Sequence, residues 1–323
     1  MVSLADIRDA QSLLKAVATR TPLLEWTGVT AKRKLFLKLE NLQPIGAFKL
    51  RGAYNKVASL SDEERRRGVI SYSSGNHAQG VAYAARALGV RAVIVMPANA
   101  PKNKLEATTA LGAEIVTVGP SSGERRLRAE QLAAEHGYVI VPPYNDEKII
   151  AGQGTVGLEI LEDLPEVETV ISPVGGGGLI SGISTAIKLT SPKVNVIGVE
   201  PELAGDARAS LQAGHIVSFP AEQVSRTLAD GLRTQSVGEI NFEHIRAYVD
   251  DIITVTEDDI LEATRALSAN SKTVAEPSGA VAVAAFLFHP AELPNTRNNV
   301  AVISGGNIAP QLLTDLHRSH RKV

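Results

Sequence analysis

The chain has 323 residues, of which 44% are hydrophobic and 21% are charged, a balance typical of a soluble globular protein with one large or two medium domains. Its 33 Lys and Arg residues and 35 Asp and Glu residues give a formal net charge of −2, so no basic field attracts nucleic acid or an anionic membrane. Cysteine is absent, which excludes disulfides, thiolate nucleophiles and thiolate metal ligands.

The N-terminus has the pattern of an amphipathic helix that begins after Ser3, with Asp6 three residues later as a capping partner. It lacks a basic stretch followed by an apolar one, so we expect no signal peptide. The longest apolar run extends from Ala280 to Phe288, and a membrane span needs roughly twice that length. We therefore expect a cytoplasmic protein that makes no membrane contact.

Short β-branched runs alternate with helical patterns along the rest of the chain. Strands are expected at residues 35–40, 69–73, 92–97, 114–118, 139–143, 169–175, 194–200 and 300–306. Helices are expected at residues 77–88, 101–111, 122–136, 178–190, 257–270 and 278–288. Several strands are apolar on both faces, as in a parallel sheet covered by helices. The pattern predicts a doubly wound α/β fold with two lobes, whose ligands bind at the carboxyl ends of the strands.

The stretch PIGAFKLRG (residues 44–52) places Lys49 directly after Gly46, Ala47 and Phe48. Partial burial there would lower the pKa of the amine, and a neutral amine is what Schiff-base chemistry needs. A helix start whose lysine reaches solvent is the simpler interpretation of the stretch alone. Both interpretations stay open at this point.

Two strand ends carry residues that suit an anion. The run from Gly175 to Gly178 opens a helix, and its backbone N–H groups can hold a phosphate, although a tight turn would explain it as well. Neither a Gly-Lys-Ser/Thr sequence nor a dinucleotide fingerprint is present, which disfavours a nicotinamide enzyme. The stretch SSGNHAQG (residues 73–80) offers hydroxyls, Gly75 and Asn76 to a carboxylate or phenolate, or only a helix cap.

Three further stretches have a simple explanation when taken alone. ISGGN (residues 303–307) fits a plain turn after a strand, and ERRLR (residues 124–128) fits a solvated helix face. Glu200 and Asp206 lie close enough to suit a hard divalent cation, but solvated loop carboxylates are the simpler interpretation.

In order along the chain, several motifs resemble the serine/threonine dehydratase and serine racemase family of pyridoxal phosphate (PLP) enzymes, which have the tryptophan-synthase-β fold (fold type II). The motifs are PIGAFKLRGAY, SSGNHAQG, AGQGT, VGGGGL, VEP, ADGL, AEPSGA and ISGGN. The resemblance covers nearly the whole chain. It implies a large PLP-binding lobe of residues 1–67 and 146–323 and a small mobile lobe of residues 68–145. It also implies a homodimer or a larger homo-oligomer.

By this resemblance, Lys49 is the Schiff-base lysine and, once freed, the base that removes the Cα proton of the substrate. The other implied cofactor contacts are Phe48 beside the ring, Asn76 at the phenolic oxygen, Ser304 at the pyridine nitrogen, and Gly175, Gly176, Gly177, Gly178 and Leu179 at the phosphate. The implied substrate-carboxylate loop consists of Ser73, Ser74, Gly75, Asn76 and His77, with Ser74 on the ring face opposite Lys49.

A neutral hydroxyl at Ser304 cannot keep the pyridine nitrogen charged as a carboxylate would, which suits loss of a β-leaving group after Cα proton removal. The resemblance implies α,β-elimination of L-threonine and/or L-serine to a 2-oxo acid and ammonia. A serine racemase is an alternative, because Ser74 matches the racemase acid/base position. A hydroxyaspartate dehydratase is another, in which Arg125 binds the distal carboxylate. A PLP-binding regulatory protein without turnover is disfavoured by the presence of Lys49 and Ser74.

The resemblance further implies a structural Mg²⁺ or Ca²⁺ held by Glu200, the carbonyl of Ala204 and Asp206. Two features depart from the family. Ala47 stands where the family usually has a serine, so one hydroxyl contact near the cofactor is missing. The chain ends at Val323, and we therefore do not expect isoleucine feedback through the regulatory domain that follows in biosynthetic threonine dehydratases.

Overall fold

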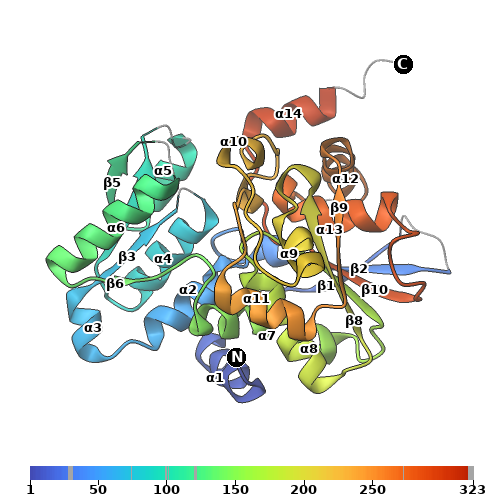
Figure 1. Cartoon of the computed structure of the whole chain (residues 1–323), viewed down its shortest axis with the longest axis horizontal. Helices are drawn as coiled ribbons and strands as arrows, with labels where there is room; N and C mark the ends of the chain where they lie inside the picture. The colour runs from blue at the N-terminus through green and yellow to red at the C-terminus, as the bar shows by residue number, and fades with distance from the viewer. Residues whose placement is uncertain are drawn as a thin grey trace.

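The computed structural model describes residues 1–27, 32–73, 75–98, 100, 102–119, 122–271 and 273–318. These residues form an α/β protein with two sheets, one of six strands and one of four. In Figure 1 the four-stranded sheet and its helices gather on the left, and the six-stranded sheet with its helices fills the right. The predicted fold class is confirmed.

The six-stranded sheet has the order β1-β2-β10-β7-β8-β9. Only β1 and β2 pair antiparallel, and every other neighbouring pair is parallel. Its strands are β1 (Leu23–Trp26), β2 (Lys34–Lys38), β7 (Thr169–Pro173), β8 (Asn195–Pro201), β9 (Asp251–Val255) and β10 (Asn298–Val302).

Helices cover both faces of this sheet, because alternate residues of each strand point to opposite faces. Ile171 of β7 packs in the same cluster as α13 (Pro277–Phe288), whereas its neighbour Val170 packs with α8 (Gly178–Thr190). Ten of the twelve residues of α13 are buried, which explains why this helix is apolar all round.

The four-stranded sheet has the order β5-β4-β3-β6, and all its pairs are parallel. Its strands are β3 (Val69–Tyr72), β4 (Ala92–Pro97), β5 (Glu114–Val118) and β6 (Val139–Ile140). Ile94 of β4 packs toward α4 (Asn76–Ala87), and Val93 packs toward α6 (Ser122–His136). All four strands fall inside residues 68–145, the range expected for the small lobe. The bounds and the mobility of that lobe stay a prediction.

The remaining helices connect the two sheets and cover their edges. They are α1 (Leu4–Leu14), α2 (Lys49–Ala58), α3 (Asp62–Arg67), α5 (Lys102–Ala110), α7 (Glu147–Asp163), α9 (Asp206–Ala213), α10 (Ala221–Val224), α11 (Glu239–Tyr248), α12 (Glu257–Asn270) and α14 (Pro310–Arg318), with short 3₁₀ turns η1 (Glu40–Leu42), η2 (Glu202–Ala204) and η3 (Asp230–Leu232). No helix within the described residues is long and apolar enough to cross a membrane.

Glycines bring α2, α7 and α8 into backbone contact. A Cβ at Gly152 of α7 would lie 2.6 Å from the Cα of Gly52 in α2. A Cβ at Gly182 of α8 would lie 2.4 Å from the backbone nitrogen of Gly154 in α7. Larger residues would push the three helices apart. Since Lys49 begins α2 and the glycine run begins α8, this packing fixes both features against one helix.

A buried cluster of four charged side chains anchors the other end of this packing. Arg51, on α2, is 1% exposed and pairs with Glu40 at 2.8 Å and with Glu159 of α7 at 2.7 Å. Lys38, which is 0% exposed, completes the cluster through a 2.6 Å contact to Glu159. The charges balance within the cluster, so four ionised groups can be buried together.

Candidate active site

Lys49 is the first residue of α2, and its amine is held inside the protein. Nζ donates a hydrogen bond of 2.6 Å to the carbonyl of Pro143 and lies 5.1 Å from the ring centroid of Phe48. Burial lowers the pKa of this amine to about 8. The interpretation of Lys49 as a lysine that reaches freely into solvent is wrong.

The end of β10 lies directly beside this lysine. Ala47 and Gly305 form an antiparallel bridge, and the Phe48 N–H donates to the carbonyl of Ser304 at 3.1 Å. Ser304 is 4% exposed, and its Oγ donates to the carbonyl of Ser278 at 3.3 Å. The ISGGN stretch is therefore more than a plain turn, since its backbone lies against the lysine-bearing segment.

The glycine run from Gly175 to Gly178 follows β7 and leads into α8. Gly177 has a φ of +93°, a left-handed conformation that favours glycine. A Cβ at Gly176 would lie 2.3 Å from the ring of Tyr144, so a side chain there would collide with that ring. The first N–H groups of a helix have no partner within it, and at α8 they are available to an anion.

One short segment joins the lysine to the glycine run. Pro143 accepts the hydrogen bond from Lys49, and the next residue, Tyr144, packs against Gly176 and Gly178. Burial, together with nearby Tyr72, raises the pKa of the Tyr144 phenol to about 12, so the phenol is neutral at physiological pH. Sequence reasoning missed Tyr144, and its only signal was the conjunction of two prolines and an aromatic residue after a strand.

Of the SSGNHAQG stretch, Ser74 lies outside the described residues. Ser73 accepts a hydrogen bond from the Gly75 N–H at 3.3 Å, and a Cβ at Gly75 would meet no atom within 4 Å. Open space therefore lies in front of this turn, at the N-terminus of α4. These features fit a carboxylate-binding loop.

Asn76 and His77 begin α4. Asn76 donates from Nδ2 to Glu276 at 2.6 Å and accepts at Oδ1 from Asn307 at 2.8 Å. Burial and the nearby Lys49 charge lower the pKa of His77 to about 3, so its ring stays neutral. His77 is 2% exposed, with Nε2 at 3.0 Å from the carbonyl of Val141.

These residues fit pyridoxal phosphate. The cofactor needs an amine for its aldehyde carbon, N–H donors for its phosphate, and polar partners for its ring. Lys49 supplies an amine of lowered pKa, the glycine run supplies a cradle that a Cβ would fill, and Asn76 and Ser304 supply polar groups. All four features meet around the segment that contains Pro143.

Residues 14–305 match the family model described as "Pyridoxal-phosphate dependent enzyme". The chain belongs to this family. The L-threonine ammonia-lyase of Thermotoga maritima is 47% identical over 100% of this chain and 81% of its own length. The catabolic L-threonine dehydratase of Escherichia coli K12 is 42% identical over 95% of this chain and 93% of its own.

Two solved structures extend the comparison to three dimensions. A bacterial threonine deaminase, from T.th., has a TM-score of 0.89 at 44% identity, covering 95% of this chain and 99% of that one. Maize serine racemase has a TM-score of 0.93 at 37% identity, covering 99% of this chain and 98% of that one. The resemblance to the dehydratase and racemase family is confirmed, and so is fold type II.

In this PLP enzyme, Glu200 and Asp206 are buried rather than solvated, so the solvated-loop interpretation is wrong. Glu200 accepts hydrogen bonds from the backbone N–H groups of Ala207 and Arg208 at 3.0 and 2.8 Å. Both oxygens of Asp206 are buried without a hydrogen-bond partner among the described residues. Burial raises the pKa of Glu200, with a contribution from Asp206, and burial raises that of Asp206 to about 7.

The expected cation is not shown by this arrangement. No group of three or more His, Cys, Asp or Glu side chains that could hold a metal ion occurs within the part of the chain that the structure describes. Two carboxylates and the carbonyl of buried Ala204 are the oxygens that the resemblance implied. The unpartnered Asp206 oxygens fit a cation, so the metal remains a proposal.

Arg125 lies on α6 and is half-buried, which lowers the pKa of its guanidinium group. Its neighbour Arg126 is exposed and pairs with Glu130 at 2.7 Å, as expected for a solvated helix face. Burial distinguishes Arg125 from this face. Its role in substrate binding stays a prediction.

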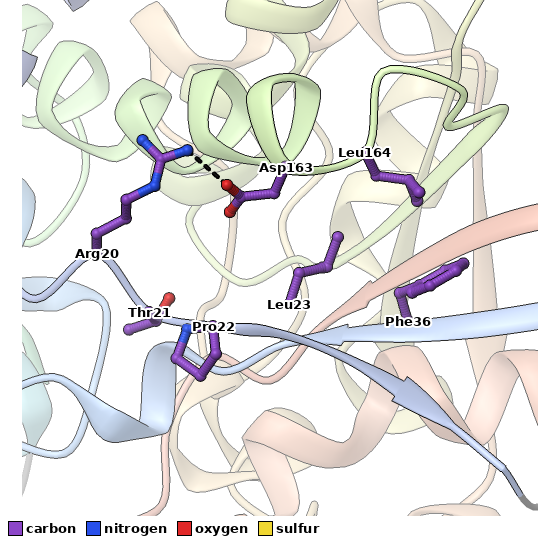
Figure 2. A pocket seen from close by; sticks show the side chains of 7 residues that line it. All are labelled: Arg20, Thr21, Pro22, Leu23, Phe36, Asp163 and Leu164. Atoms are coloured by element: carbon purple, nitrogen blue, oxygen red, sulfur yellow. Dashed lines mark hydrogen bonds and ion pairs between the residues drawn. The ribbon is translucent and has the colours of Figure 1, made fainter.

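A separate surface pocket of about 310 Å³ lies between β1, β2 and the end of α7. Figure 2 shows Arg20 and Asp163 joined by an ion pair at one end and the apolar side chains of Leu23, Phe36 and Leu164 at the other. None of the predicted site residues lines this pocket. The ion pair satisfies the two charged groups, so the pocket presents no free charge to a ligand.

Proposed function

We propose that this PLP enzyme is an ammonia-lyase that converts L-threonine and/or L-serine to a 2-oxo acid and ammonia by α,β-elimination. One observation carries the proposal: the buried amine of Lys49, with its lowered pKa, is bonded to Pro143, next to the residue that packs on the glycine run. The names of the relatives, L-threonine ammonia-lyase and L-threonine dehydratase, support the same substrate class.

Bound pyridoxal phosphate supplies an electron sink for the charge that develops at the substrate Cα. Lys49 holds the cofactor and, after the substrate amine replaces it, takes the Cα proton at Nζ. The Pro143 carbonyl orients Nζ, and the low pKa keeps a useful fraction of the amine neutral. Phe48 packs beside the amine and excludes water.

The polar groups around Lys49 divide the remaining tasks. The backbone N–H groups of Gly175, Gly176, Gly177, Gly178 and Leu179 hold the phosphate. Asn76 binds the phenolic oxygen, and the hydroxyl of Ser304 meets the ring nitrogen. Because Ser304 is neutral, the ring nitrogen is not held as a cation by a carboxylate, which favours rapid loss of the β-leaving group.

The loop of residues 73–77 binds the substrate carboxylate. The open space at Gly75 and the N-terminus of α4 support this role. His77 contributes shape and a neutral ring rather than charge. By the family resemblance, Ser74 faces the substrate from the side opposite Lys49.

Residues 68–145 form a small lobe that closes on the lobe of residues 1–67 and 146–323. Direct contacts join the two ranges at the site: Asn76 to Glu276, and Lys104 to Asp230. Breaking and remaking these contacts would open and close the substrate loop. We also propose a homodimer or larger homo-oligomer, and we expect light scattering to give a mass above 34.2 kDa.

A second candidate is serine racemase, which the likeness to maize serine racemase favours. A third is hydroxyaspartate dehydratase, in which the half-buried Arg125 binds the second carboxylate. A panel of β-hydroxy amino acids distinguishes the three, with detection of 2-oxo acid and ammonia and chiral analysis of the remaining substrate. We expect 2-oxo acid from L-threonine or L-serine. A product mixture of D- and L-serine without 2-oxo acid would replace the elimination proposal with the racemase.

A structural Mg²⁺ or Ca²⁺ bound by Glu200, the carbonyl of Ala204 and Asp206 belongs to the same proposal. Its support is the pair of buried, unpartnered oxygens of Asp206 beside a second buried carboxylate, among the residues that the structure describes. Two buried carboxylates repel each other unless a proton or a cation lies between them. Oxygen atoms of this kind are the ligands that both ions prefer.

A further inference from the structure

Glu276 is a buried carboxylate beside the proposed cofactor contacts, and none of the steps above uses it. It is 3% exposed and precedes the first residue of α13. Its Oε1 accepts a hydrogen bond of 2.6 Å from Nδ2 of Asn76. A Cβ at Gly305 would lie 2.4 Å from the same Oε1 and 3.0 Å from Nδ2 of Asn76. Both side chains therefore lie against the residue that follows Ser304.

The carboxylate determines which way the amide of Asn76 points. A carboxylate only accepts hydrogen bonds, so it selects the orientation that turns the NH₂ group toward Glu276. On the other side, Oδ1 of Asn76 accepts from Nδ2 of Asn307 at 2.8 Å. That Nδ2 also donates to the carbonyl of Ile45 at 2.9 Å, which fixes Asn307 in turn. A reversed amide at Asn76 would place oxygen against oxygen and NH₂ against NH₂.

This arrangement leaves one N–H of Asn76 for the cofactor. A primary amide has two N–H donors, and the contact with Glu276 uses one of them. Asn76 begins α4, which packs closely on α2 where Lys49 is found: a Cβ at Gly80 would lie 3.1 Å from the carbonyl oxygen of Lys49. The second N–H is a donor of fixed direction in a site that the lysine also faces.

We propose that Glu276 is a positioning residue, which holds the Asn76 amide so that its second N–H is directed at the phenolic oxygen of pyridoxal phosphate. This inference rests on the proposed function. It assigns Glu276 no contact with the cofactor, and its effect acts entirely through Asn76.

The surroundings of Glu276 connect this role to the meeting of the two sheets. Asn76 and Lys104 come from α4 and α5, beside the four-stranded sheet, whereas Glu276 and Asp230 come from the other side. Burial and the charge of Asp230 raise the pKa of Glu276 to about 7, and Lys104 and the Asn76 N–H lower it. Lys104 also forms an ion pair with Asp230. The orientation of Asn76 is therefore fixed only when residues from both sides are in contact.

The test compares Glu276→Leu, which lacks an acceptor, with Glu276→Gln, which keeps an acceptor and the size. One sample of cofactor-free protein gives the melting temperature, and another is titrated with pyridoxal phosphate, with visible absorbance and fluorescence as readouts. We expect Glu276→Leu to weaken cofactor binding about tenfold or more, the cost of losing a hydrogen bond to a charged group. We also expect a shifted absorbance maximum, because the phenolic oxygen loses its oriented donor.

Two comparisons separate positioning from a structural role. Glu276→Gln should keep most of the affinity of the parent, because its amide oxygen still accepts from Asn76. The cofactor-free melting temperature of Glu276→Leu should stay close to that of the parent, since an apolar residue of similar volume can replace a buried charge without loss of stability. Ser278→Ala is the matched control two residues further on, where Oγ accepts from Gly231 instead. Its cofactor absorbance should match the parent.

Glu276→Leu with the affinity and absorbance of the parent would overturn the inference, as would equal losses in Glu276→Gln and Glu276→Leu. If Glu276→Leu does not fold, Asn307→Leu frees the other end of the same amide and should weaken and shift the cofactor in the same way. Parent-like binding in Asn307→Leu would overturn the inference. A parent protein that binds no pyridoxal phosphate would instead contradict the proposed function.

Discussion

The lowered pKa of Lys49 gives a direct prediction about its chemical reactivity in cofactor-free protein. With a pKa of about 8, about one Lys49 amine in ten is neutral at pH 7, whereas an ordinary lysine with a pKa near 10.4 is neutral in only about one molecule in 2,500. Only the neutral amine is a nucleophile. Lys49 should therefore react with an amine-directed reagent roughly two hundred times faster than an ordinary lysine of equal accessibility.

The assay is pH-dependent labelling with a small reagent, followed by mass spectrometry of the peptides. The rate at Lys49 should rise with pH and reach half of its maximum near pH 8. The exposed Lys102 in the same digest calibrates the reagent at each pH. A Lys49 rate that is still rising steeply at pH 10 would refute the reasoning, because it would mean that burial does not destabilise the ammonium form.

Three further predictions follow from the packing. Arg51→Leu removes one cation from the buried cluster and should lower the free energy of unfolding by about 3–5 kcal/mol in denaturant titrations, whereas Arg67→Leu, at an exposed pair, should change it by less than about 1 kcal/mol. Gly176→Ala places a Cβ 2.3 Å from the Tyr144 ring and should weaken pyridoxal phosphate binding at least tenfold, by about 1.4 kcal/mol or more, and adding Tyr144→Ala should recover part of the loss. Chelator should lower the melting temperature and the activity together, with recovery on adding Mg²⁺, and Asp206→Ala should lose this response; a parent protein indifferent to chelator would contradict the metal.

The strands of the two sheets were predictable because most of them are buried on both faces and read as apolar runs. All eight expected strands are present, most of them with shorter ends. The strand expected at 139–143 ends at Ile140, because Pro142 and Pro143 cannot donate to a sheet. Sequence reasoning missed β1 and β9, which lie at the two edges of the larger sheet, where one side has no partner strand among the described residues and the apolar pattern is weaker.

The candidate site was predictable as a set of motifs, because each one falls at a strand end or helix start with unusual local composition. Contacts between distant segments were not. Lys38 and Arg51 look like surface residues in the sequence, and they are buried only because Glu40 and Glu159 converge on them. Likewise, Asn76 had a predicted role, but its hydrogen bond to a buried carboxylate 200 positions later has no local signal.

The central claim is that Lys49 carries pyridoxal phosphate in a protein that eliminates water and ammonia from L-threonine or L-serine. The most direct measurement is borohydride reduction of the purified protein under turnover-competent conditions, followed by peptide mapping of the cofactor adduct. We expect the adduct on Lys49 alone, with loss of 2-oxo acid formation in proportion to the adduct. An adduct on another lysine, with the same loss of activity, would contradict the account.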